Sequence, residues 1–401
     1  MASKWPGLIA NAERLLGGPA PFINLDLLVS SEASFLASRA RRVASNVDHP
    51  FFDTIRAYLR GKTVKTPFLS LPSKVVPYPN VSYSPTRASG GLITLLLGQC
   101  CAGQQASCVK LCGQHRKVAE IFETVNLAIS IHKSLVFPEK KSLGDCANHS
   151  HANMVKHLEA GNKVATLAGD VLLATVSSSL AAFHNSEVVD VVSEAMGDML
   201  EAEYCPLALH FHHGPSTSSK QPLTQPTTGS PSDPDFTRPW LDYIGLARGS
   251  LLGACCNSTV ILSHPHEDRA AQALSLIARQ LGHNWATLVR LLDEREFARR
   301  LFEADNCAIS PQRERIPFKE NGLPEPTLLD AFDLQSELPV PCDLVLEHYH
   351  SIASRLITDL HGAFHNLRAA IEHMASNERA STSALTILGD LVNHVAQEAT
   401  A

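Results

Sequence analysis

Apolar residues recur three and four positions apart over most of this 401-residue sequence, which is the spacing of one face of an α-helix. The segment 114–136 is the clearest case, because Val118, Ile121, Phe122 and Val125 fall on one face. The same spacing predicts helices at 3–18, 30–43, 51–59, 90–102, 161–184, 186–203, 239–257 and 268–302, and two or three more between 343 and 397. Convincing alternating strands between hairpin turns do not occur in the sequence. We therefore expect an all-α fold.

Composition excludes several classes of protein. With 44% apolar and 18% charged residues, the chain can bury a large core and is not disordered as a whole. Its net charge of −6 provides no basic field for nucleic acid or an anionic membrane. The most apolar run, 164–183, carries Asp170 and several Ser or Thr residues, so we read it as a core helix and expect no transmembrane segment. The first residues contain no recognisable secretory or mitochondrial presequence.

Three segments interrupt the helical pattern. Residues 62–87 and 214–239 are rich in Pro, Ser or Thr, and 306–341 is also Pro-rich. The helical pattern is similar on both sides of the first two segments. We therefore expect one domain over residues 1–401, with inserted loops at 62–87 and 214–239.

The segment from Gly161 to Ala174 reads G-N-K-V-A-T-L-A-G-D-V-L-L-A. It resembles the G-x-K-x-A-x-L-x-G-D-x-L-L-A helix of the all-α trans-prenyltransferases, the polyprenyl diphosphate synthases. Gly161, Lys163, Gly169 and Asp170 carry this signature, and His132 matches the family's histidine before its first aspartate motif. The resemblance implies the isoprenoid synthase helical bundle, folded as a single large domain.

Members of this family hold Mg²⁺ with two D-D-x-x-D motifs on facing helices. Carboxylates at i, i+1 and i+4 share a helix face, and Mg²⁺ prefers oxygen ligands. In this chain the first motif is replaced by Lys133, Ser134 and Phe137, and the second by Val289, Arg290 and Asp293, of which only the last is acidic. We therefore expect no metal site and no intact catalytic residues. The family's diphosphate-binding turn and Lys-Thr pair are also altered, at 90–95 and 247–248.

This degeneracy resembles the second subunits of heteromeric polyprenyl diphosphate synthases, and residues 5–28 and the junction at 49–50 resemble them as well. The resemblance implies a non-catalytic subunit whose enzyme is active only as a heteromer. A heterotetramer is one possible form of that heteromer. Its partner would be the catalytic subunit 1, which would bind Mg²⁺ and make the ubiquinone side chain from isopentenyl and allylic diphosphates. A location in the mitochondrial matrix and a peripheral membrane contact through the product also follow from the resemblance. The alternative is a prenyl-chain or lipid-binding scaffold without a catalytic role.

Other residue groups have plainer interpretations. His361 and His365 are spaced like zinc ligands, but Gly362 follows the first where a zinc protease has glutamate, so we do not expect zinc. Cysteines at 100, 101, 108 and 112 are expected to be packed thiols in a reducing compartment.

Lys133 and Arg290 allow two interpretations. They could bind a diphosphate or a lipid anion without metal. Alternatively they pair internally with Asp170, Asp293 or Glu294 or simply face water, and we favour internal pairing because burying a lone cation is costly. For the partner interface we expect the helices at 90–102 and 114–136, which are more apolar than one buried face requires.

Overall fold

We describe the protein from a computed structural model. The structure describes residues 4–17, 89–102, 109–135, 149–208, 237–264, 269–305, 325–335, 342–374 and 380–400. All elements of this part of the chain are helical, and it contains no strand. The elements are α1 (Trp5–Leu15), α5 (Gly90–Cys101), α6 (Val109–Lys133), α7 (His149–Ala181), α8 (Ser186–Ala202), α10 (Arg238–Ile244), a π-helical turn η3 (Gly245–Gly249), α11 (Ser250–Ser263), α12 (Arg269–Asp305), α13 (Leu328–Gln335), α14 (Cys342–Met374) and α15 (Ala380–Thr400). The all-α prediction is confirmed.

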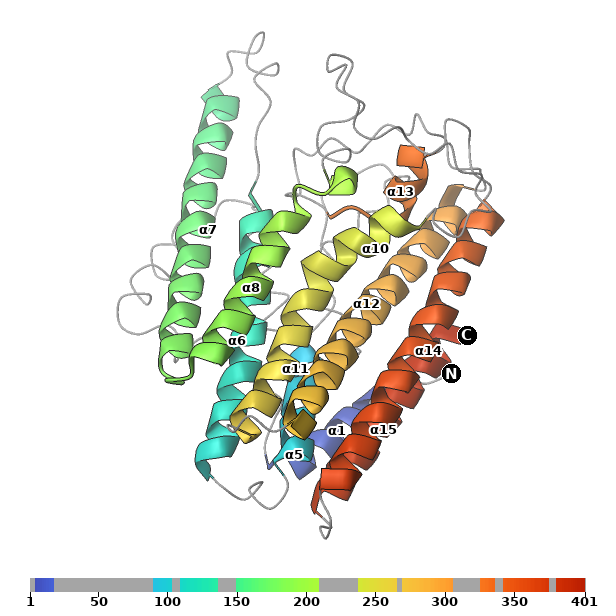
Figure 1. The fold of residues 1–401 in the computed structure, drawn as a ribbon. Helices are drawn as coiled ribbons and strands as arrows, with labels where there is room; N and C mark the ends of the chain where they lie inside the picture. The colour runs from blue at the N-terminus through green and yellow to red at the C-terminus, as the bar shows by residue number, and fades with distance from the viewer. Residues whose placement is uncertain are drawn as a thin grey trace.

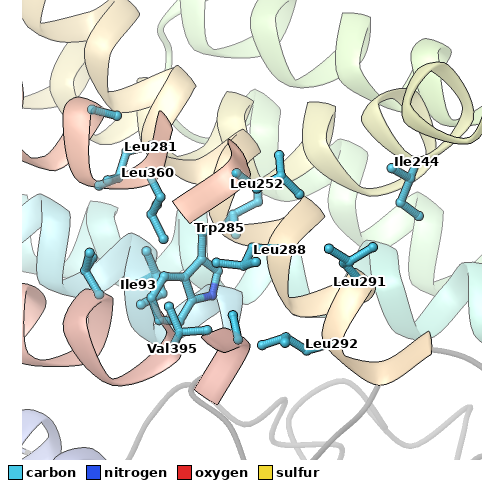
Figure 2. Close-up of a cluster of buried hydrophobic side chains, with 14 of the residues drawn as sticks. Ile93, Ile244, Leu252, Leu281, Trp285, Leu288, Leu291, Leu292, Leu360 and Val395 are labelled. Atoms are coloured by element: carbon cyan, nitrogen blue, oxygen red, sulfur yellow. The ribbon is translucent and has the colours of Figure 1, made fainter. Parts of the chain in front are cut away.

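The long helices lie side by side in one bundle, with α7 at one edge and α14 and α15 at the other (Figure 1). Helix α12 packs against both α11 and α14 and runs through the middle of the largest core. Trp285 of α12 lies at the centre of this core, among apolar side chains of α5, α11, α14 and α15 (Figure 2). The neighbours labelled in Figure 2 include Ile93, Leu252, Leu281, Leu288, Leu360 and Val395.

Local signals account for where several helices begin. The Ser89 hydroxyl accepts a hydrogen bond from the Leu92 N–H at 3.2 Å and caps α5. Asn185 caps α8 in the same way, at 3.1 Å from the Val188 nitrogen. Proline occupies the first turn of α1 and α10, where its missing N–H costs nothing.

The predicted helices match the structure apart from the bounds of several helices and one missed element. Helix α6 begins at Val109 rather than at residue 114, and α11 ends at Ser263 rather than at residue 257. Helix α7 begins at His149 rather than at residue 161, and the predicted helix at 239–257 is broken by the π-helical turn η3. Helix α13 was not predicted at all, and α10 begins at Arg238, inside the end of the loop predicted at 214–239. The predicted helices at 30–43 and 51–59, the loop at 62–87 and the rest of the second loop lie outside the described residues.

Helix α5 is buried within its own chain, contrary to the prediction that it lies at a partner interface, whereas α6 is buried on one side only and the prediction for it stays a prediction. In α5 only Gly90 and Gln99 are not fully buried, since α6, α11 and α15 pack around it. Val125 of α6 is 1% exposed and belongs to a second apolar cluster with α7, α8 and α11. The hydrophobicity of α5 on all sides therefore reflects packing inside the chain.

Helix α7, in contrast to α5, leaves apolar side chains exposed on one face. Two of the described helical stretches are long and apolar enough to cross a membrane, Glu159–Ala181 and Arg238–Ser263, which by itself is weak evidence for a span. The second is a core segment because 83% of its apolar window is buried, whereas only 28% of the first is buried. The prediction of a core helix at 164–183 is therefore right for one face only. Leu167 and Val171 remain 44% exposed on the other side.

The first and last helices are joined. Trp5 of α1 donates through Nε1 to the Glu398 carboxylate of α15 at 2.9 Å, and its ring meets Trp285 edge-on at 6.4 Å. Arg295 of α12 donates to the backbone carbonyls of Glu398 and Ala399 at 2.8 and 2.6 Å. These hydrogen bonds hold α1 and α12 against the C-terminal part of α15.

Candidate functional site

Lys133 and Arg290, which are expected at positions of the two aspartate motifs, meet at a buried carboxylate that belongs to neither motif. Lys133, at the end of α6, places Nζ 2.9 Å from Oε1 of Glu325. Arg248 of η3 donates through Nη2 to the same oxygen at 2.7 Å. Arg290 of α12 has Nη1 3.8 Å from the other oxygen, Oε2. Three cations from three helical elements thus surround one side chain of the segment that precedes α13.

This cluster is shielded from water. The side chain of Glu325 is 1% exposed, that of Arg290 5% and that of Lys133 15%. Burial on its own would raise the pKa of the Glu325 carboxyl, but Arg248, Lys133 and Arg290 outweigh burial and hold that pKa well below its ordinary value. Glu325 is therefore an ionised internal counter-ion.

Two further acids complete the network. Glu203 lies 2.8 Å from Lys133 Nζ, and Glu294 lies 2.8 Å from Arg290 Nε. Of the internal pairs predicted for the two cations, the one between Arg290 and Glu294 is confirmed. Asp170 was the wrong partner for Lys133, because it lies against His132 instead.

Glu294 fixes the segment that carries Glu325. Its Oε2 accepts hydrogen bonds from the Trp240 indole and from the backbone N–H of Leu328, both at 2.9 Å. Burial is the largest influence on this carboxyl and raises its pKa to about 7, against the opposing effect of Arg290 and the two donors. Asp330 accepts from the backbone N–H and hydroxyl of Thr327 at 2.7 Å and ties the first turn of α13 together. The position of Glu325 is therefore set by a folded element.

Several buried polar atoms in this region have no hydrogen-bond partner among the described residues. They include the Tyr243 hydroxyl, Arg290 Nη2 and Glu325 Oε2. Arg290 Nε and Glu294 Oε1 are close enough for an ion pair but are not aligned for a hydrogen bond. Buried groups of this kind normally find a partner. The ion pairs of the cluster therefore leave some of its buried polar atoms without a hydrogen bond among the described residues.

The residues of the degenerate motifs do not fit Mg²⁺. A magnesium site needs oxygen ligands, whereas Lys133 and Arg290 present cations and Val289 packs against the main core. The Ser134 hydroxyl is used within its own helix, donating to the Ile131 carbonyl at 2.6 Å. The described residues contain no group of three or more acidic, histidine or cysteine side chains that could hold a metal. Phe137 lies outside the described residues.

The signature residues of α7 explain how it packs on α6. The His132 ring lies over Gly169, where an added Cβ atom would come within 2.1 Å of Nε2. The same nitrogen is 3.4 Å from the Asp170 carboxylate and 3.3 Å from the Thr166 carbonyl. Gly161 is buried and Lys163 is exposed. Gly169, Asp170 and His132 thus form a contact between α6 and α7, and their arrangement does not indicate a catalytic role.

The other candidates behave as packing or surface residues. His361 is partly exposed and His365 exposed on α14. The thiols of Cys100 and Cys101 are buried, as expected for packed cysteines, and so are those of Cys255 and Cys256. Cys112 is only partly buried, and Cys108 lies outside the described residues. Burial raises the pKa of Cys101 and of Cys256 to about 12, so these thiols are poor nucleophiles.

The sequence is similar to proteins named as prenyl diphosphate synthases. It is 26% identical to the human "All trans-polyprenyl-diphosphate synthase PDSS2" over 65% of this chain and 56% of that protein. The rat protein of the same name is 25% identical over 68% and 58% of the two chains. The rice "Solanesyl-diphosphate synthase 1, mitochondrial" is 24% identical over 67% and 52%. The chain therefore spans about half the length of the curated relatives it matches. No family model matches the sequence.

Solved structures with a similar helical arrangement carry related names. A medium/long-chain length prenyl pyrophosphate synthase from Arabidopsis, in its apo form, aligns over 94% of this chain and 98% of its own, with a TM-score of 0.47 and 16% identity. Heptaprenyl diphosphate synthase from Staphylococcus aureus aligns over 90% and 97%, with a TM-score of 0.45 and 13% identity.

Proposed function

Because the chain is a homologue of the PDSS2 subunits of the trans-prenyltransferase family, we propose that it is a non-catalytic subunit of a heteromeric trans-polyprenyl diphosphate synthase. Its partner is a catalytic subunit that carries intact aspartate motifs and binds Mg²⁺. The heteromer extends an allylic diphosphate with isopentenyl diphosphate to make a polyprenyl chain. This polyprenyl chain becomes the side chain of ubiquinone. Relatives from rice and Neurospora crassa are named as mitochondrial, which supports a mitochondrial location.

One observation carries this proposal. The place where the two motifs face each other is filled by an ion-pair network of Lys133, Arg248 and Arg290 around Glu325. Catalysis of this kind requires metal ions that neutralise the leaving diphosphate. A site closed by its own salt bridges, with cations at the ligand positions, supports a scaffold role rather than a catalytic one.

The exposed side of α7 supports the existence of a partner. Leu167 and Val171 lie on it, and Leu200 and Tyr204 at the end of α8 are even more exposed, at 69% and 75%. Large apolar side chains exposed in this number are typical of a surface that another chain covers. A stable subunit interface of this class buries roughly 2,000 Å² or more. We therefore place the partner on the α7–α8 side, in place of α5.

Reconstitution tests the proposal. The chain is purified alone and with a matching catalytic subunit, and each sample is assayed for Mg²⁺-dependent prenyltransfer and sized by light scattering. We expect no product from the chain alone, and a stable complex whose activity needs both chains. The proposal fails if the isolated chain turns over after contaminating host synthase is removed. It also fails if the catalytic subunit alone reaches full rate and product length, or if no complex forms at micromolar concentrations.

The alternative, a lipid-binding scaffold without a catalytic partner, draws on the same exposed α7 face. It predicts that the chain alone sediments with phospholipid vesicles and that a catalytic subunit does not compete for the surface. Vesicle sedimentation with and without the catalytic subunit therefore separates the two functions.

A further inference from the structure

The outer face of α8 carries a row of apolar side chains. The helix lies near the α7 edge of the bundle (Figure 1) and packs on α11 and η3. Its inner side belongs to the second apolar cluster through Val188, Val192 and Met199. The outer row follows the helical spacing and continues into the turn after α8, with two partly exposed and two strongly exposed members: Val189, Met196, Leu200 and Tyr204.

An acidic row runs beside the apolar row along the whole of α8. Every charged residue of this helix is acidic, and the acids recur three or four positions apart, at Glu187, Asp190, Glu194, Asp198 and Glu201. At about 100° per residue, these side chains lie within an arc of roughly 80° on one side of the helix. All are exposed except Asp198, which is partly exposed, and none forms an ion pair with a described residue.

The acidic row does not stabilise α8 itself. Asp190, Glu194 and Asp198 are four positions apart, where like charges repel one another. Only Glu187 lies in the first turn, where the helix dipole favours negative charge. Glu201 lies at the other end, where the dipole opposes a carboxylate, and the last turn contains no basic residue. The distribution of charge on α8 therefore suits a partner outside the helix better than it suits the helix.

We propose that the outer face of α8 docks a basic amphipathic helix of the partner chain. The apolar side chains of that helix cover the row that ends at Leu200 and Tyr204, and its Lys or Arg side chains pair with the acidic row. The inference deepens the proposed function, which supplies the identity of the partner chain, while the two rows supply the chemistry of the docking helix. An apolar row alone accepts any apolar helix, whereas the acidic row restricts the choice to a basic one.

The same two rows disfavour a second copy of this chain. A two-fold interface brings the same surface of both copies together. Two antiparallel α8 helices would place acidic row against acidic row, and two parallel ones would place each acidic row against the apolar row of the other copy. Neither arrangement provides a base for any carboxylate, because α8 contains none. The charge therefore favours a different chain as the occupant.

The test measures binding of two synthetic helical peptides to the full chain by fluorescence anisotropy. Both peptides have the same length and the same leucine row, and they differ only in carrying Lys or Glu beside that row. We expect the Lys peptide to bind at least tenfold more tightly than the Glu peptide. Its affinity should fall at least tenfold in Asp190→Asn/Glu194→Gln/Glu201→Gln, and also in Leu200→Ser/Tyr204→Ser, in which the apolar row is shortened.

The matched control removes three negative charges elsewhere. Glu347→Gln/Asp359→Asn/Asp390→Asn changes exposed positions of α14 and α15 and should bind the Lys peptide like the unmodified chain. An equal loss of affinity in this control overturns the inference, because the effect then follows from net charge alone.

Three other results also overturn it. They are equal binding of the two peptides, unchanged binding of the Lys peptide by either α8 variant, and a dimer of the unmodified chain that Leu200→Ser/Tyr204→Ser abolishes. The comparison of the two peptides uses the unmodified chain, so it decides the inference even if a variant fails to fold. No catalytic subunit is present, so the result is independent of whether the proposed heteromer assembles or turns over.

Discussion

Burial of Glu123 makes the stability of this fold depend on pH in a direction that can be worked out. Glu123 lies on α6, is 3% exposed and accepts a hydrogen bond from the Gly91 N–H at the start of α5, at 3.1 Å. Burial is the main influence and raises its pKa from the ordinary 4.5 to about 7, while the bonds from Gly91 and Ser89 lower it by less. Between about pH 4.5 and 7, the Glu123 carboxyl is therefore protonated in the folded chain and ionised in the unfolded chain.

The sign follows from the raised pKa. Between about pH 4.5 and 7 the folded state binds more protons than the unfolded state, so this residue lowers the free energy of unfolding as the pH rises through that window. Since one pKa unit corresponds to about 1.4 kcal/mol, the loss above pH 7 amounts to about 3 kcal/mol. Glu123→Gln cannot ionise, and its amide oxygen can still accept from Gly91. We expect Glu123→Gln to gain about 3 kcal/mol over the unmodified chain between pH 5 and 8.

Urea unfolding at pH 5, 6, 7 and 8, followed by circular dichroism, measures this difference. Taking the difference between the two chains cancels groups that are unchanged, Glu325 among them. Glu159→Gln, at an exposed position of α7, is the control and should follow the unmodified chain at every pH. A difference that stays within about 0.5 kcal/mol from pH 5 to 8 would refute the reasoning, because Glu123 would then ionise as easily in the folded chain as in the unfolded one.

Three further substitutions test other contacts. Gly169→Ala should lower the free energy of unfolding by about 1–3 kcal/mol, because the added Cβ would meet the His132 ring. In a His132→Ala background the same change should raise it by about 1 kcal/mol, because alanine then only favours the helix. An effect of the same sign in both backgrounds would contradict this reasoning. Lys133→Met should lower the melting temperature and leave turnover per assembled heteromer unchanged, whereas a proportional loss of turnover would place Lys133 in the chemistry. Leu167→Asp should raise the Kd for assembly with the catalytic subunit at least tenfold, measured by analytical ultracentrifugation, without changing the melting temperature of the chain alone. Leu276→Asp, also at an exposed apolar position, is the control and should assemble normally.

Sequence reasoning identified most of the described helices and the cations Lys133 and Arg290, but it missed α13, the third cation Arg248 and the counter-ion Glu325. The spacing of apolar residues identifies α6 because every turn of that helix places a side chain in a core. Glu325 leaves no such pattern, since it lies between Pro324 and Pro326 in a segment without helical period. Its ion pair with Lys133 joins residues 192 positions apart. Only the three-dimensional packing of the bundle brings these two charges together.

Burial of α5 within the chain could not be distinguished in advance from burial against a partner, for a physical reason. A helix that is apolar on all sides, such as α5, can be covered by its own chain or by another, and the sequence does not distinguish the two cases. Helix α7 has many Ser and Thr residues, yet its hydroxyl groups are partly used up within the helix. Thr166, Thr175, Ser177 and Ser178 each donate to a backbone carbonyl four residues earlier. That arrangement makes the exposed face of α7 less polar than its composition indicates.

The contact between α1 and α15 limits how early this bundle can be completed during synthesis. The Trp5 indole and the Glu398 carboxylate that it meets are 393 positions apart, so this hydrogen bond cannot form until α15 has been synthesised. At about 5–20 residues per second, the synthesis of the residues between the two partners takes roughly 20–80 s. Until then the sides of α1 and α5 that pack on α15 lack the helix that covers them. The nascent chain is therefore expected to bind general chaperones during translation, and substitution of Trp5 should prolong that association.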